Sequence, residues 1–186
     1  DKAESRGLGD VYKRQANIPY IIRARVVLLR DLGSAISPFN AFQIIQGLET
    51  VALRMKQHCE NAEKVKKFLQ KHSKVDKVIY STLHDGEIGD RAKRYLKGGY
   101  GALMGIELKG GLEAGKKFID SLKMLYHVAN IGDARSLAIH PASTTHSQLN
   151  DKDMAAAGVT PGYVRLSIGI EHSDDIIADI DQALNA

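Results

Sequence analysis

Arg165 lies in a stretch whose apolar and polar residues alternate, YVRLSIGIE at residues 163–171. The apolar positions are Val164, Leu166, Ile168 and Ile170. This period of two predicts a strand with one face on a core, so we expect the Arg165 side chain to point away from that core. A planar guanidinium on a rigid strand can bind both oxygens of a carboxylate. The strand alone also fits an arginine in a structural ion pair, and both roles stay open at this point.

Two other polar features follow predicted strands. The turn Asn130-Ile131-Gly132-Asp133 comes at the end of a short strand predicted for residues 126–130. The loop from His140 to His146 (HPASTTH) follows a strand predicted for residues 136–139. Together with Arg165, these strand-end features could converge on one small anionic ligand.

Residues 110–117 (GGLEAGKK) nearly match the phosphate-binding loop G-x-x-x-x-G-K-[ST]. Lys117 replaces the hydroxyl residue that would hold Mg²⁺, and Leu112 already belongs to a helical apolar stripe, which puts Gly115 inside a helix. We therefore interpret the segment as a strand, a Gly-Gly turn and a helix.

The histidines and the cysteine show no pattern of a metal site or a nucleophile. His140 and His146 have no carboxylate or cysteine at ligand spacing, so we expect them and the neighbouring hydroxyls to hydrogen-bond the loop and the residues around it. His58 and Cys59 are neighbours on a predicted helix and point about 100° apart, which is typical of a core cysteine and not of a catalytic pair.

The predicted elements alternate between short strands and amphipathic helices. Strands are expected at 75–80, 102–108, 126–130, 136–139 and 163–171, and helices at 85–96, 112–125, 151–157 and from a Ser173 cap onward. This order indicates an α/β class in which a small sheet is covered by helices mainly on one side.

A long helical segment precedes these elements. Ser37 and Pro38 are a favourable N-cap and first helical residue, and helical periodicity continues to His72. We expect one long or broken helix over residues 38–72 that connects two domains, with a solvated charged face at residues 60–71. Residues 1–15 are polar without a clear period and are interpreted as a foreign or disordered tail.

Composition limits the class of protein. The chain has 186 residues, a formal net charge of +4 and no tryptophan, and no aromatic and basic stripe suggests a nucleic-acid partner. Its one cysteine excludes an internal disulfide and fits a reducing compartment. No apolar run could span a membrane, so the expectation is a soluble cytoplasmic protein.

Five ordered motifs together resemble the carboxy-terminal part of the Cys/Met-metabolism enzymes that use pyridoxal phosphate. The motifs are SPFNAF at 37–42, GLET at 47–50 with LRM at 53–55, NIGDA at 130–134, HPASTTH at 140–146 and VRLSIGIE at 164–171. The resemblance covers residues 16–186 and is greatest to the O-acetylhomoserine sulfhydrylase branch. It implies an aspartate-aminotransferase-like, fold-type I arrangement in which residues 16–37 are a remnant of the cofactor domain and 73–186 a substrate-binding domain.

The resemblance also implies roles for two residues. Arg165 matches the family arginine that binds the substrate α-carboxylate, and Asn130 matches a contributor to the same site. The complete enzyme would use pyridoxal 5'-phosphate, take O-acetylhomoserine and sulfide, and form a homo-oligomer. The Ser-x-Thr-Lys motif that carries the cofactor is absent from the sequence, so we expect no catalytic or cofactor-binding residue in this chain. The alternatives are a methionine γ-lyase-like or cystathionine γ-synthase-like reaction, or a non-catalytic fragment that serves only as an interaction module.

Overall fold

A computed structural model describes residues 19–186 of the chain. The tail expected at residues 1–15 lies outside the described residues. The chain divides into two units, residues 1–49 and 50–186, and each is described by itself.

The described part of the first unit is helical. Helix α2 (Pro19–Arg23) continues through a π-helical segment, η1 (Ala24–Leu29), into α3 (Arg30–Leu32). Gly33 ends this run with φ of 67°, a left-handed conformation that glycine adopts without steric cost. Helix α4 (Pro38–Glu49) begins after Ser37, whose hydroxyl accepts a hydrogen bond from the Asn40 amide at 3.2 Å, so the predicted N-cap is confirmed.

The helix expected over residues 38–72 is broken. Thr50 leaves helical geometry at φ −106° and ψ 3°, and α5 (Val51–Leu69) begins at the next residue. The boundary between the two units falls at this break.

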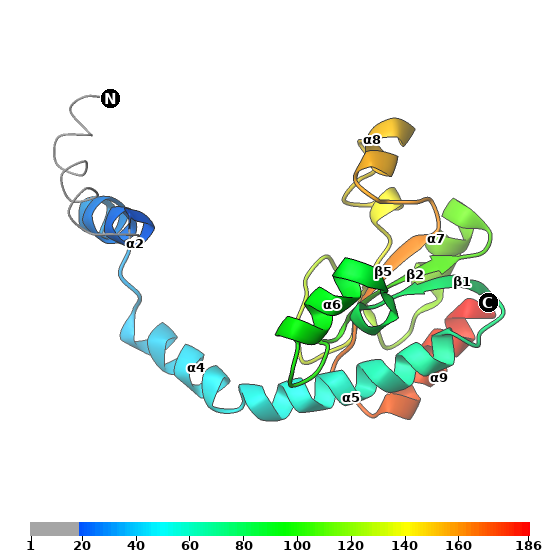
Figure 1. Cartoon of the computed structure of the whole chain (residues 1–186), viewed down its shortest axis with the longest axis horizontal. Helices are drawn as coiled ribbons and strands as arrows, with labels where there is room; N and C mark the ends of the chain where they lie inside the picture. Colours follow the sequence, from blue (N-terminus) through cyan, green and yellow to red (C-terminus); the bar gives the residue numbers. More distant parts are fainter. Residues whose placement is uncertain (1–18) are drawn as a thin grey trace. The chain divides into compact units, whose positions relative to one another are not determined.

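A five-stranded mixed sheet forms the centre of the second unit (Figure 1). Its strands are β1 (Val75–Ile79), β2 (Leu103–Leu108), β3 (Tyr126–His127), β4 (Leu137–Ile139) and β5 (Tyr163–Ser167). The spatial order is β1-β2-β5-β4-β3, antiparallel except for the β3–β4 pair. A bulge interrupts the β1–β2 register between Val75 and Lys77.

Three helices cover one face of this sheet. Helices α5, α7 (Gly111–Ser121) and α9 (Ser173–Leu184) supply the apolar residues that pack on the strands. Met104 and Ile106 of β2 and Val164 and Leu166 of β5 point into this core and are almost fully buried. The α/β class with helices mainly on one side of a small sheet is therefore confirmed. In β2 and β5, the residues that were predicted to face the core do so.

The remaining elements are short. They are η2 (Ser81–Leu83), α6 (Gly86–Tyr95), η3 (Pro141–Ser143) and α8 (Asp151–Ala156). The expected cap of the last helix is corrected by one residue: His172 is the N-cap of α9, and its ring accepts a hydrogen bond from the Asp174 amide at 3.4 Å, while Ser173 is the first helical residue.

Asp179 connects α9 to the loop that leads into β3. Its carboxylate accepts hydrogen bonds from the backbone amides of Lys123, Met124 and Leu125 at 2.9–3.0 Å, and it is 7% exposed. Three amide donors compensate the burial of the negative charge, so this side chain fixes where β3 begins.

A candidate carboxylate-binding site

The polar face of β5 carries the strongest sequence candidate. Val164 and Leu166 are fully buried in the core, whereas Tyr163, Arg165 and Ser167 lie on the opposite face of the strand. Arg165 is held on both sides by the sheet, since it pairs with Gly105 of β2 and Ile139 of β4. The backbone under the guanidinium is therefore rigid.

The Arg165 side chain reaches the turn that follows β3. Its Nη2 donates hydrogen bonds to the carbonyl oxygens of Ala129, at 2.7 Å, and Asn130, at 3.3 Å. In the part of the chain that the structure describes, Arg165 forms no ion pair with a carboxylate. The structural ion pair left open by the sequence is therefore not found among these residues, and two carbonyl acceptors orient the guanidinium instead.

Ser167 holds the same turn from two residues further along β5. Its hydroxyl oxygen accepts a hydrogen bond from the Gly132 amide at 3.1 Å. Gly132 has φ of 76°, which the turn requires and which a side chain would oppose. Arg165 and Ser167 thus bind the turn with opposite polarity, one to its carbonyls and the other to an amide.

The structure brings Asn130 and Arg165 together, as the sequence suggested. Both residues line an open hollow whose other walls are Ala129, Ile131, Gly132 and Asp133. Asp133 is half-buried, and its pKa lies below the usual range chiefly because the Arg135 amide donates a hydrogen bond to it. Arg135 in turn lies 4.2 Å from the ring centroid of Tyr126.

The segment after β5 is fixed by side chains from α5 and from the start of β4. His58 bonds the Ile168 carbonyl at 2.6 Å, and Asn61 donates to the carbonyls of Gly169 and Glu171. The Glu171 carboxylate accepts from the amide and the hydroxyl of Ser136. An ideal Cβ at Gly169 would lie 2.5 Å from the Ala134 carbonyl oxygen and from the Ser136 amide nitrogen, so glycine is required there. The motif VRLSIGIE therefore combines an arginine in the hollow with residues that hold its strand.

Tyr163 lies at the other end of the same face. An ideal Cβ at Gly105 would lie 2.4 Å from the Tyr163 ring, so the absence of a side chain on β2 makes room for it. Burial raises the pKa of the Tyr163 phenol, the Glu107 carboxylate raises this pKa further, and the positive Arg165 opposes both effects.

Other sequence candidates lie outside the hollow. His140 is fully buried and bonds the Ser143 hydroxyl and the Pro161 carbonyl, each at 2.8 Å, as expected for a histidine within its loop. Gly115 is inside α7, so residues 110–117 form the predicted turn and helix. Cys59 is only half-buried, which corrects the expectation of a core cysteine.

Comparison with known proteins agrees with this arrangement. The sequence profile of the family described as Cys/Met metabolism PLP-dependent enzyme matches residues 10–185. The chain belongs to this family. The match begins six residues before the start expected at Ala16, within the segment interpreted as foreign.

Curated relatives in the family include two O-acetyl-L-homoserine sulfhydrylases. The protein from Leptospira meyeri is 57% identical over 169 residues, which is 90% of this chain and 38% of that protein. The Thermus thermophilus protein is 47% identical over 167 residues, 90% of this chain and 40% of that protein. The chain thus spans about two fifths of the length of the curated relatives that it matches.

A solved structure gives the same result for the fold. A putative O-acetylhomoserine (thiol)-lyase from Campylobacter jejuni superimposes with a TM-score of 0.81 at 42% identity, over 91% of this chain and 41% of that one. That structure contains N'-pyridoxyl-lysine-5'-monophosphate, the cofactor joined to a lysine.

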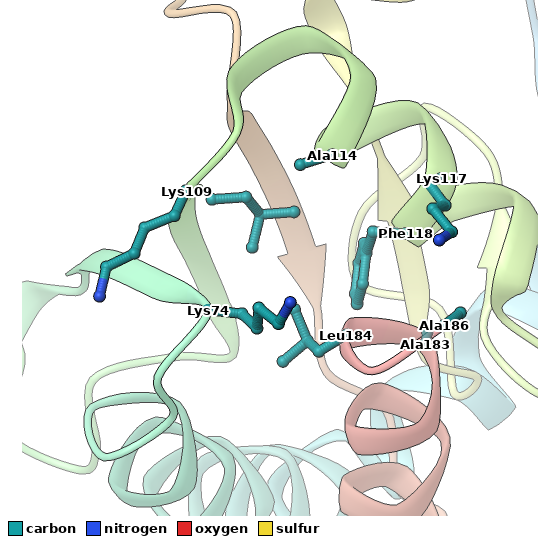
Figure 2. Close-up of a pocket in the computed structure, with 9 residues that line it drawn as sticks. Lys74, Lys109, Ala114, Lys117, Phe118, Ala183, Leu184 and Ala186 are labelled. Carbon is teal, nitrogen blue, oxygen red and sulfur yellow. The ribbon is translucent and has the colours of Figure 1, made fainter.

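Pyridoxal phosphate requires an amine, donors for its phosphate and a partner for its ring nitrogen. The described pocket with the most lysines lies on the helix-covered side of the sheet and has a volume of about 150 Å³. Figure 2 shows Lys74, Lys109 and Lys117 around the apolar side chains of Phe118 and Leu184. Its lining contains no acidic or hydroxyl side chain, and Lys109 donates to the Ser73 carbonyl at 2.8 Å. The lining of this pocket does not fit the family's cofactor.

Sequence reasoning missed Ser167 as a member of this site. Its position two residues after Arg165 on an alternating strand was the available signal, because i and i+2 share a face. Its partner, Gly132, could not be predicted, since the contact depends on how the turn after β3 folds over β5.

Proposed function

We propose that the chain is the substrate-binding part of an enzyme that makes homocysteine from O-acetylhomoserine and sulfide. In this γ-replacement the bond from the γ-carbon to the acetate oxygen breaks, acetate leaves with the electron pair, and a carbon–sulfur bond forms. The observation that carries the proposal is the oriented guanidinium of Arg165 at an open hollow. The two sulfhydrylase relatives support the choice of substrates.

Arg165 is proposed to bind the α-carboxylate of the substrate. Hydrogen bonds from Nη2 to the carbonyls of Ala129 and Asn130 orient the guanidinium and leave its Nε–H and Nη1–H donors for a substrate. A planar, charged donor group held in this way can bind a carboxylate through charge-assisted hydrogen bonds. Asn130 is proposed to contribute through its backbone carbonyl, which holds Arg165, and through its place in the wall of the hollow.

The rest of the machinery is proposed to come from outside this chain. Residues 16–37 are assigned to the edge of a cofactor domain, 38–72 to the helical connection and 73–186 to the substrate-binding domain. The working enzyme is proposed to be a cytoplasmic homo-oligomer that uses pyridoxal 5'-phosphate. Among the described residues, no helix combines the length and the apolar character needed to cross a lipid bilayer.

A chimera tests the proposal directly. This chain replaces the matching residues of the Leptospira meyeri relative, and homocysteine formation is measured with Arg165 intact, with Arg165→Ala and with Arg165→Lys. Loss of a desolvated charge partner costs about 2–5 kcal/mol, a drop in kcat/KM of roughly 30-fold to several thousand-fold. Lysine keeps the charge without the fork, so Arg165→Lys should recover only part of the activity.

The matched control is Arg91→Ala, which removes an exposed arginine of α6 that pairs with Glu87. This change should leave kcat/KM within about threefold, since Arg91 does not line the hollow. A loss below threefold for Arg165→Ala in a folded chimera would contradict the carboxylate role. Loss of cofactor absorbance in step with activity would contradict it as well.

A γ-lyase reaction is the second candidate, because an L-methionine gamma-lyase from Fusobacterium nucleatum is 44% identical over 161 residues. The same chimera separates the two reactions. Methanethiol release from methionine without added sulfide would favour the lyase, and homocysteine formed only with sulfide and O-acetylhomoserine would favour the sulfhydrylase. A chimera inactive in both assays, although folded and loaded with cofactor, would favour the non-catalytic module.

A further inference from the structure

We infer that Ser167 is a positioning residue that keeps the Arg165 guanidinium in the orientation needed to bind a substrate carboxylate. The inference rests on the carboxylate role proposed for Arg165. Ser167 is almost fully buried, with 3% of its surface exposed. Its hydroxyl would affect substrate binding only through the Arg165 side chain.

The geometry joins the two residues through one short turn. Arg165 and Ser167 project from the same face of β5, and both contact residues 129–132. Arg165 donates to the carbonyls of Ala129 and Asn130, and Ser167 accepts from the Gly132 amide at 3.1 Å. The strand therefore holds the first part of the turn through its carbonyls and the last part through an amide.

This division of contacts explains why a hydroxyl stands at residue 167. The Gly132 amide points at the strand, where Ser167 is almost fully buried, and an N–H that loses its acceptor in such a partly buried contact costs free energy. The guanidinium of Arg165 can only donate, so it cannot serve this amide. Ser167 supplies the acceptor, and the turn is then fixed at both ends.

Movement of the turn would be transmitted to the arginine. The two carbonyl oxygens that set the guanidinium plane belong to residues only two and three positions before Gly132. If the turn shifts, these acceptors shift, and the guanidinium turns away from the orientation in which its Nε–H and Nη1–H donors reach the carboxylate. Because charge-assisted hydrogen bonds depend on this geometry, the expected consequence is weaker substrate binding.

A double-mutant cycle in the chimera tests the inference. Ser167→Ala and Arg165→Ala are made singly and together, and kcat and KM for O-acetylhomoserine are measured. With Arg165 present, Ser167→Ala should lower kcat/KM by about three- to tenfold, mainly through KM, as expected for one hydrogen bond. Combined with Arg165→Ala, it should lower kcat/KM by less than about twofold, because the group it positions is gone.

A control and a second measurement separate positioning from stability. Ser121→Ala also removes one serine hydroxyl, which donates to the Lys117 carbonyl within α7, and it should change kcat/KM by less than about twofold in both backgrounds. Hydrogen exchange should show faster exchange at the Gly132 amide in the Ser167→Ala chimera only. Equal losses from Ser167→Ala in both backgrounds, or unchanged exchange at Gly132, would overturn the inference while leaving the proposed function intact. An Arg165→Ala chimera with undiminished kcat/KM would overturn both.

Discussion

The ring of His140 occupies the space that a side chain at Gly115 would need. An ideal Cβ at Gly115 would lie 2.3 Å from His140 Nε2, well inside van der Waals contact. His140 cannot move easily, because it is fully buried and bonded through both ring nitrogens. The glycine of the apparent phosphate-loop motif is therefore needed for helix packing.

We expect Gly115→Ala to destabilise the fold by about 1–3 kcal/mol, the usual cost of overpacking. The gain in helix propensity, about 1 kcal/mol, offsets only part of this. Urea unfolding followed by circular dichroism measures the change, and Lys117→Ala, at an exposed position of the same helix, is the control. A Gly115→Ala protein at least as stable as the parent would show that His140 can give way.

Asp179→Ala should destabilise the second unit more strongly. The change leaves the amides of Lys123, Met124 and Leu125 without their acceptor, which we expect to cost about 3 kcal/mol or more. The midpoint of urea unfolding reports the loss. Asp175→Ala, on the exposed first turn of the same helix, should cost less than about 1 kcal/mol. Similar losses for the two variants would mean that the three bonds contribute little.

Stability should fall at alkaline pH because of Tyr80. This residue is 2% exposed and donates to the Gly101 carbonyl at 2.7 Å, and burial, followed by the Glu63 charge, raises the pKa of its phenol. A folded-state pKa above the unfolded value stabilises the fold fully below about pH 10, and this contribution is lost as pH rises further.

The free energy of unfolding, measured by urea titration between pH 8 and 11, should therefore decrease less steeply in Tyr80→Phe than in the parent. Tyr80→Phe should itself lose about 1 kcal/mol at pH 8, for the missing hydrogen bond. Tyr95→Phe is the control, since Tyr95 is 68% exposed and its profile should follow that of the parent. If the free energy of unfolding falls equally steeply with pH in all three proteins, ionisation of Tyr80 does not cause the loss of stability.

The chain by itself should associate through α4. Phe39, Phe42, Ile44, Ile45 and Leu48 are each more than half exposed on this helix, and exposed apolar side chains grouped in this way promote association. Light scattering should detect self-association, and Phe42→Ser with Ile45→Ser should increase the fraction of monomer. Tyr95→Ser, which removes a comparably exposed ring from α6, should not. A monodisperse parent that binds no hydrophobic dye would contradict this.

The chain by itself should also form no specific cofactor adduct. No Ser-x-Thr-Lys motif occurs in its sequence, and the pocket lined by Lys74, Lys109 and Lys117 does not fit the cofactor. After incubation with pyridoxal phosphate and borohydride, mass spectrometry should find label scattered over several lysines at low occupancy, and homocysteine should not form. Stoichiometric label on one lysine, together with turnover, would refute this.

The sequence was sufficient for much of the fold because its strands alternate clearly. The periods in residues 102–108 and 163–171 predicted both the strands and the face that carries Arg165. The break at Thr50 could not be located, since helical periodicity continues across it. The order β1-β2-β5-β4-β3 depends on pairings between residues far apart in the chain, which local periodicity does not encode.

The exposure of long charged side chains was predicted less well than the strands were. Residues 60–71 were expected to form a solvated charged face, yet Lys66 is 8% exposed, with its ammonium bonded to Glu63 at 2.6 Å and to Thr82 at 3.1 Å. Its aliphatic stem can pack while its head finds polar partners, so charge alone does not predict exposure. Asn130 was expected near Arg165, but the Ala129 carbonyl was not, since backbone carbonyls carry no sequence signal.

The bulge in β1 has a consequence for how this protein can aggregate. β1 and β3 are the two outer strands, and an unprotected outer strand can recruit strands from other molecules into fibrils. At the β1 edge of the sheet, the register shift between Val75 and Lys77 disturbs the regular row of backbone donors and acceptors. At the opposite edge, β3 has only two residues that could pair with another strand. Pairing with strands from other molecules is therefore disfavoured at both edges of the sheet. Aggregates of this chain should accordingly keep native helix content and lack cross-β diffraction.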